Sequence, residues 1–218
     1  MKRVCLFIVG IALLITGKAL AYDDHDFQVW NTDVEEFKIN DKTKMAFEEE
    51  FRWGDNASEF FYQHYDIGFF RDLNKYLNLG AGYRQVFDLK SGKFKPEEEP
   101  YMTATFFGEL KGFKFDDRSR LEYRHFDYQA DSWRYRNKFT LKTPWKFTKA
   151  QIQPYLSDEI LIGFAAITQL NENRFYSGFG FNISQDIKGE LYYMLRSVKS
   201  TDKWVDSNVL GTKIKIAF

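Results

Sequence analysis

The sequence predicts an all-β protein: a single transmembrane, antiparallel, up-and-down β-barrel. Three observations favour this fold. Apolar and polar residues alternate along most of the chain, aromatic residues make up 19% of it, and charged residues make up 28%. In a membrane barrel one face of each strand meets lipid and the other meets the lumen, so apolar side chains alternate with charged ones. A soluble β-sandwich also alternates, but it has less need of so many aromatic residues.

The end of the chain favours the same fold. Residues 210–218 alternate, with Leu210, Ile214, Ile216 and Phe218 on one face and two lysines on the other. An aromatic final residue on such a strand is typical of the outer-membrane barrels of Gram-negative bacteria. We therefore expect Phe218 to be the signal that the barrel assembly machinery reads.

The N-terminus predicts export. Lys2 and Arg3 precede an apolar run over residues 4–15, and residues 19–21 read Ala-Leu-Ala, a small-residue cleavage site. These are the parts of a Sec signal peptide. The run is too short for a membrane helix, which needs roughly 20 apolar residues. We expect a signal peptide over residues 1–21 and one barrel domain over residues 22–218.

Composition excludes several other classes. The 31 Lys and Arg residues balance 31 Asp and Glu residues, which is not the balance of a nucleic-acid-binding protein. The single cysteine, Cys5, lies in the expected signal peptide, so the exported chain has no disulfide, catalytic thiol or cysteine metal site. The histidines His25, His64 and His125 lack the spacing of metal ligands. We expect no cofactor and no metal.

Eleven stretches have the pattern of strands, each near the ten or so residues that a tilted strand needs to cross a bilayer. In chain order they cover residues 27–39, 44–53, 59–70, 76–87, 101–110, 118–125, 132–142, 150–161, 171–184, 189–197 and 208–218. Bacterial single-chain barrels have even strand numbers, so one more strand is expected. The weak alternation at residues 31–33 predicts a break that divides the first stretch into two short strands, which gives twelve strands in all. The alternative is ten strands, with residues 22–39 outside the wall.

The connectors predict an orientation. Short ones at residues 40–42, 71–75, 111–112, 143–149 and 185–188 alternate with mostly longer ones at residues 54–58, 88–100, 126–131, 162–170 and 198–207. Outer-membrane barrels have short periplasmic turns and longer external loops, and a last strand that ends in the periplasm gives the same assignment. The acidic run over residues 96–100 is then expected in a solvated external loop. Alternation also directs Glu49 toward lipid, which a bulge or a position near the head groups would relieve.

Several motifs resemble a known family. They are Phe27-Gln28-Val29-Trp30, Glu50-Phe51-Arg52, residues 79–84 (LGAGYR), residues 133–137 (WRYRN), residues 154–159 (PYLSDE), and Asn173-Arg174 followed by Gly178-Phe179-Gly180. Together they resemble the outer-membrane family catalogued as domain of unknown function 2490, over nearly the whole exported chain. The resemblance implies an outer-membrane barrel without an established activity. In size the chain is also similar to small twelve-stranded oligosaccharide porins.

Alternation assigns a set of charged residues to the lumen. Ten of them, which we call the main lumen set, are Arg84, Arg118, Arg120, Glu122, Arg124, Arg134, Arg136, Glu159, Arg174 and Arg196. Lys138, Glu190, Lys213 and Lys215 share the same inward parity. Bases outnumber acids in this set, and a basic lining concentrates small anionic solutes. In a barrel this small, the alternative is that buried charges pair across neighbouring strands and close the lumen.

One contact can be predicted in detail. Pairing about a turn near Trp145 places Glu159 opposite Arg134, and the next strand brings Arg174 to the other side of Glu159. One carboxylate between two guanidiniums would satisfy these charges in a poorly hydrated interior. We expect a clamp of these three residues that braces three strands.

The sequence thus favours a monomeric outer-membrane barrel, surrounded by outer-membrane lipid and lipopolysaccharide. Its lumen is expected either to pass small anionic solutes or to serve a structural role in the envelope, with no catalytic residue. The alternative of another class is a lipid esterase or deacylase acting at the outer leaflet. For that enzyme His125 and Ser132 would be the base and the nucleophile.

Overall fold

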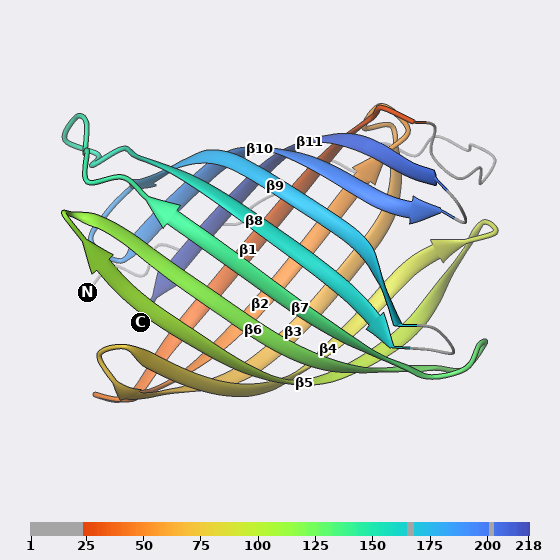
Figure 1. The fold of residues 1–218 in the computed structure, drawn as a ribbon, viewed down its shortest axis with the longest axis horizontal. Helices are drawn as coiled ribbons and strands as arrows, with labels where there is room; N and C mark the ends of the chain where they lie inside the picture. Colours follow the sequence, from red (N-terminus) through yellow and green to blue (C-terminus); the bar gives the residue numbers. More distant parts are fainter. Residues whose placement is uncertain (1–23, 165–167, 201–202) are drawn as a thin grey trace, which may run out of the picture.

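The computed structural model describes residues 24–164, 168–200 and 203–218, and it confirms the all-β barrel (Figure 1). Within these residues eleven strands form one closed sheet. They are β1 (Asp26–Asn40), β2 (Thr43–Gly54), β3 (Glu59–Asn74), β4 (Leu77–Lys90), β5 (Lys93–Leu110), β6 (Phe113–Phe126), β7 (Ser132–Lys142), β8 (Gln153–Phe164), β9 (Thr168–Asn182), β10 (Ile187–Ser200) and β11 (Lys203–Ala217). The described part of the chain holds no helix that is long and apolar enough to span a membrane.

One parallel pair closes the barrel. β1 runs beside β11 in the same direction, with Trp30 opposite Gly211, whereas every other neighbouring pair is antiparallel. The expectations of twelve and of ten strands are both wrong. β1 continues unbroken through residues 31–33, because its polar residues find partners across the sheet. The Thr32 hydroxyl, for example, donates to Glu50 Oε2 at 2.9 Å.

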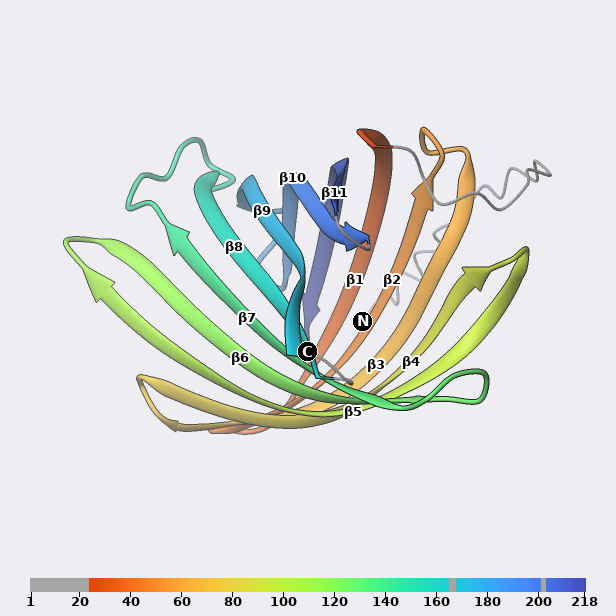
Figure 2. The ribbon, with the colours of Figure 1, turned by 45° about the vertical axis from the view of Figure 1, so that its right-hand side comes forward.

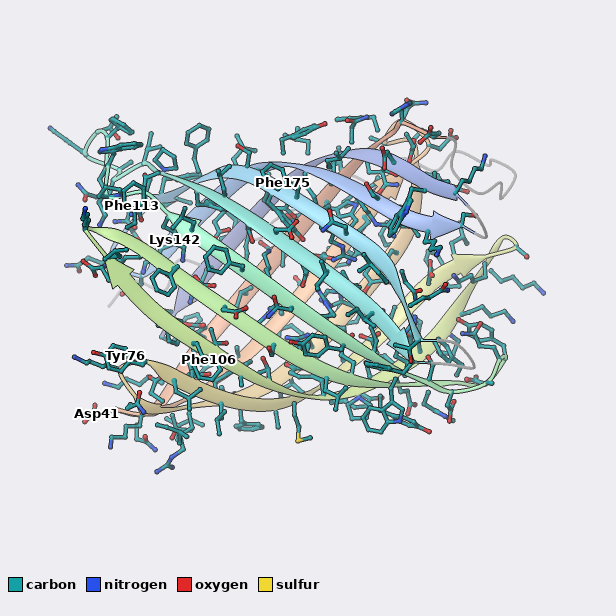
Figure 3. All side chains as sticks on the ribbon, viewed as in Figure 1. Asp41, Tyr76, Phe106, Phe113, Lys142 and Phe175 are labelled. Carbon is teal, nitrogen blue, oxygen red and sulfur yellow. The ribbon has the colours of Figure 1, made fainter. Side chains whose placement is uncertain are left out.

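The odd number of strands places Asp26 and Ala217 at opposite ends of the barrel. The N-terminal rim carries the start of β1 and the connectors that follow β2, β4, β6, β8 and β10. The C-terminal rim carries the end of β11 and the connectors that follow β1, β3, β5, β7 and β9. Asp41 and Tyr76 mark the C-terminal rim at the left of Figure 3. Figure 2 shows the same strands from a second direction, all tilted across the wall.

β5 begins much earlier than expected. Ser91 and Gly92 have φ values of 51° and 74°, and positive φ at two central residues makes the tight turn that suits a hairpin. β5 therefore pairs with β4 from Lys93 onward, and residues 96–100 are strand, not external loop. The expected difference in connector length does not hold either, because the longest connector, residues 143–152, lies at the C-terminal rim.

Side chains alternate between the outer wall and the lumen. Phe106 and Phe175 are about half exposed on the outer wall (Figure 3). On the inner side of β1 and β8–β11, an aromatic and aliphatic cluster consists of Trp30, Tyr155, Tyr176, Tyr192, Met194 and Val209. Gly211 leaves room for this cluster, since a Cβ there would lie 2.0 Å from the Tyr192 ring.

Polar residues also face outward near the middle of several strands. Glu49 lies opposite Asp33 with no register shift at that point, so no bulge turns it away. Other outward groups bond to one another. The Asn137 amide donates to Asp117 Oδ1 at 2.6 Å, and the Asn173 amide donates to Asp158 Oδ1 at 3.0 Å.

Candidate functional site

The lumen is the candidate site, because it gathers most of the buried charge. All ten charged residues of the main lumen set point inward: eight of them line its cavities, and Arg120 and Glu122 are buried in the wall between. A cavity of about 770 Å³ opens toward the N-terminal rim, and one of about 260 Å³ lies deeper. Both are lined by Arg52, Arg84, Arg136 and Arg174. These four arginines and their carboxylate partners form a layer between the cavities, which we call the waist.

Glu159 is the most connected carboxylate of the waist. It is 1% exposed, and it lies 2.8 Å from Arg136 Nη2, 3.1 Å from Arg118 Nη2 and 3.4 Å from Arg174 Nη1. The Tyr176 hydroxyl donates to its second oxygen at 3.2 Å. One carboxylate therefore joins side chains from β6, β7, β8 and β9.

This geometry corrects the expected clamp. The Arg174 arm is present, because Arg174 on β9 lies directly opposite Glu159 on β8. The Arg134 arm is wrong, because Glu159 stands opposite Lys138, four residues further along β7. The hairpin turns later than expected, through a bridge between Phe147 and Ile152. A shift of four residues keeps every side chain on its face, so the inward direction of Glu159 was predicted although its partner on β7 was not.

Arg134 belongs to a second cluster nearer the N-terminal rim. Its Nε donates to Glu122 Oε2 and its Nη2 to Glu99 Oε1, both at 2.5 Å. Glu122 is fully buried and also accepts from Arg136 at 3.2 Å. Arg124 pairs with Glu97 on the rim side of this cluster. The shared partner Arg136 connects the second cluster to Glu159.

On the opposite wall of the waist, Arg84 was predicted to face the lumen but Arg52 was not. The Arg52 guanidinium lies between two aromatic rings, 3.6 Å from the Trp30 centroid and 3.8 Å from the Tyr62 centroid. Its Nη2 is 2.5 Å from Glu50 Oε1. Cation–π contact and a carboxylate together hold this guanidinium in place.

Arg84 and His64 complete that wall. Arg84 Nη2 lies 3.0 Å from Asp66 and 3.3 Å from Glu48. His64 is 1% exposed and places Nε2 3.3 Å from Glu48 and Nδ1 3.1 Å from the Tyr62 hydroxyl. His64 is thus held in a polar network within the wall.

The lumen is less basic than expected. Carboxylates outside the predicted set also face inward and form ion pairs, among them Glu48, Glu50, Asp66, Glu97, Glu99 and Glu172. Alternation around Glu49 already directs Glu48 and Glu50 inward, so the inward direction of these two carboxylates could have been predicted from the sequence. Glu97 and Glu99 were assigned to a loop because the turn at residues 91–92 was not recognised. The corrected lining is a largely paired mixture of both signs.

The residues of the alternative enzyme do not form a pair. His125 bonds through Nδ1 to Asp131 at 3.0 Å. Ser132 stands opposite the inward-facing Arg124, so Ser132 faces the lumen while His125 lies on the outer face of the wall. Hydrogen bonds from Tyr123, His125 and the Phe126 amide lower the pKa of Asp131 to about 2. The described residues hold no group of three or more His, Cys, Asp and Glu side chains placed to bind a metal ion.

Phe218 packs at the C-terminal rim beside the seam of the barrel. Its ring stacks on Phe37 with centroids 4.9 Å apart. Its amide donates to the Glu36 carbonyl at 2.8 Å, and its own carbonyl accepts from the Lys38 amide at 3.3 Å. The final residue therefore helps to join β11 to β1.

Comparison with known proteins gives a family and no activity. The family described as "Protein of unknown function (DUF2490)" matches residues 27–207. The chain belongs to this family. The comparisons with curated proteins and with solved structures gave no match.

Proposed function

We propose that this member of the family is an outer-membrane barrel whose ion-paired waist closes the lumen to free diffusion. Its role is then that of a self-braced envelope protein and not of an open porin. It is exported by the signal peptide expected over residues 1–21, assembled by the barrel machinery, and monomeric among lipid and lipopolysaccharide.

One observation carries this proposal: each guanidinium of the waist has a carboxylate within 3.0 Å. The pairs are Arg52 with Glu50, Arg84 with Asp66, Arg136 with Glu159, and Arg174 with Glu172. Two of these pairs, Arg84 with Asp66 and Arg136 with Glu159, join neighbouring strands, and the other two lie within β2 and β9. They also lack the free fixed charge that draws ions through an open pore. Breaking such a pair leaves an uncompensated buried charge, so the network resists opening.

Planar-bilayer recording of the refolded protein tests this role. We expect no steady current from the wild type and a measurable current from the double variant Arg136→Ala/Glu159→Ala, which removes the centre of the waist. The matched control is Asp158→Ala/Asn173→Ala, which removes an outward hydrogen-bonded pair from β8 and β9 and should stay silent. A steady open current from the wild type would reject the closed waist.

A second candidate, passage of small anions, is favoured by the lysines at the C-terminal rim. If the waist variant conducts, its reversal potential in a salt gradient should show anion preference, and cation preference would reject this candidate. The lipid-hydrolase alternative requires cleavage of phospholipid or lipid A that is lost in both His125→Ala and Ser132→Ala. We expect no such cleavage, because these two side chains point to opposite faces of the wall.

A further inference from the structure

The half of the lumen toward the C-terminal rim differs from the rest in charge. A third cavity, of about 360 Å³, lies at this rim and shares Lys142, Tyr155, Glu190 and Lys213 with the 260 Å³ cavity. We call these two connected spaces the C-terminal vestibule. Lys142 lies near this end of the barrel (Figure 3). Small-molecule sites commonly have volumes of about 300–1,000 Å³, so the vestibule is large enough for one.

The rim part of the vestibule is lined by five lysines and a single carboxylate. The lysines are Lys142, Lys146, Lys188, Lys213 and Lys215, and the carboxylate is Glu190. Three of the lysines have partners outside this lining: Lys142 with Asp116, Lys213 with Glu48, and Lys215 with Glu36. In the described structure Lys146 and Lys188 form no ion pair within 4.0 Å. Glu190 accepts a hydrogen bond from the Tyr155 hydroxyl. The mouth therefore keeps an excess of positive charge.

Lys138 extends this excess to the floor of the vestibule. Its ammonium lies 3.8 Å from the centroid of the Tyr176 ring. No carboxylate of the described residues lies within 4.0 Å of it, whereas the ten arginines and glutamates of the main lumen set all have ion-pair partners. An ammonium that forms no ion pair in a confined space is unfavourable, and Glu159, which stands opposite Lys138, pairs with arginines. A bound anion would supply the counter-charge.

We propose that the C-terminal vestibule binds a small anion that carries a phosphate group, with Lys138 as its innermost contact. Lysine is a common phosphate ligand because its compact ammonium acts as a point charge with three donors. Several such ammoniums around one space favour a multiply charged anion over chloride. The ligand is either free phosphate or a small phosphomonoester, and it enters from the C-terminal rim without crossing the waist.

The test is titration of the full barrel in non-ionic detergent with inorganic phosphate at low ionic strength, followed by calorimetry and by ³¹P line broadening. We expect Lys138→Met to weaken phosphate binding at least tenfold and Lys138→Arg to retain most of it. Glu190→Gln should tighten binding several-fold, because it removes the one carboxylate of the mouth. The matched control is Lys111→Met, an exposed lysine in a turn of the same rim that does not line the vestibule.

Glucose 6-phosphate and sulfate, titrated in parallel, separate a phosphomonoester site from a site for free oxyanions. Heat-modifiable mobility on gels confirms that each variant is folded. Absence of phosphate binding in the wild type, or equal affinity in the wild type and a folded Lys138→Met variant, would overturn the proposal. A wild-type bilayer current would reject the closed waist while leaving phosphate binding untouched, so the two proposals fail separately.

Discussion

Glu159→Gln is the substitution that tests the waist most directly. The change keeps the shape of the side chain but removes the charge that faces Arg118, Arg136 and Arg174. It also replaces one acceptor oxygen with an amide that points its hydrogens at guanidiniums. Removing one partner from a buried ion pair costs about 3–5 kcal/mol.

The surroundings place this substitution at the lower end of that range. Arg136 keeps Glu122 at 3.2 Å and Arg174 keeps Glu172 at 2.6 Å. The Arg118 side chain is 30% exposed, so it can turn toward water in the cavity. We therefore expect a loss of about 3 kcal/mol in the free energy of unfolding.

The assay is urea unfolding of the refolded barrel in lipid vesicles, followed by tryptophan fluorescence. Asp158→Asn is the matched control: it changes the neighbouring residue on the outward face, and we expect it to cost less than about 1 kcal/mol. Adding Arg136→Gln to Glu159→Gln should cost less than the sum of the single changes, because the two side chains interact. A loss below about 1 kcal/mol for Glu159→Gln would refute the assignment of Glu159 as the centre of the waist.

Three further predictions concern the rims. Deletion of Phe218 removes the ring stacked on Phe37 and two backbone hydrogen bonds to β1, so outer-membrane levels and heat-modifiable mobility should fall. Phe218→Tyr should assemble normally, and normal assembly of the truncated chain would contradict this prediction. Because the expected exported chain has no cysteine, Ser91→Cys should react with an impermeant maleimide on intact cells and Lys111→Cys only after permeabilisation; the reverse pattern would invert the proposed orientation. The pKa of Asp131 is lowered to about 2. Its hydrogen bonds to Tyr123, His125 and the Phe126 amide therefore stabilise the loop fully at pH values above the ordinary aspartate pKa near 4, and this stabilisation is lost as pH falls through about 2. Amide exchange of Phe126 should rise over that interval, and Asp131→Asn should show a high, pH-independent opening of the loop from the start.

Local patterns predicted the wall of this barrel well. Alternation over residues 76–87 and 132–142 matches β4 and β7 closely, because side-chain direction in a strand depends only on counting by two. The same rule directs Arg84, Arg136 and Glu159 inward without any knowledge of their neighbours. The turn at Lys111 and Gly112 was also predicted as a short connector between two strand patterns. Its φ values of 50° and 83° are those of a tight hairpin.

The errors arose where the answer depended on a neighbouring strand. Residues 96–100 have the composition of a solvated loop, yet β4 pairs with them and buries Glu97 and Glu99 against Arg124 and Arg134. The weak stretch at residues 31–33 remains strand because β2 and β11 hold it from both sides. Eleven stretches had the pattern of strands, and the rule of even strand numbers raised the count to twelve by dividing this segment, whereas the structure keeps eleven.

The sequence by itself determined the all-β barrel, the faces of its well-alternating strands and the inward direction of the ten charges of the main lumen set. Only the tertiary structure decided the parallel closure of β1 on β11, the partner of each charge and the division of the lumen into waist and vestibule. The physical reason is that side-chain direction is set by the backbone of one strand, whereas pairing depends on the register between strands. A turn that closes a few residues later leaves every face unchanged and gives Glu159 a different arginine on β7.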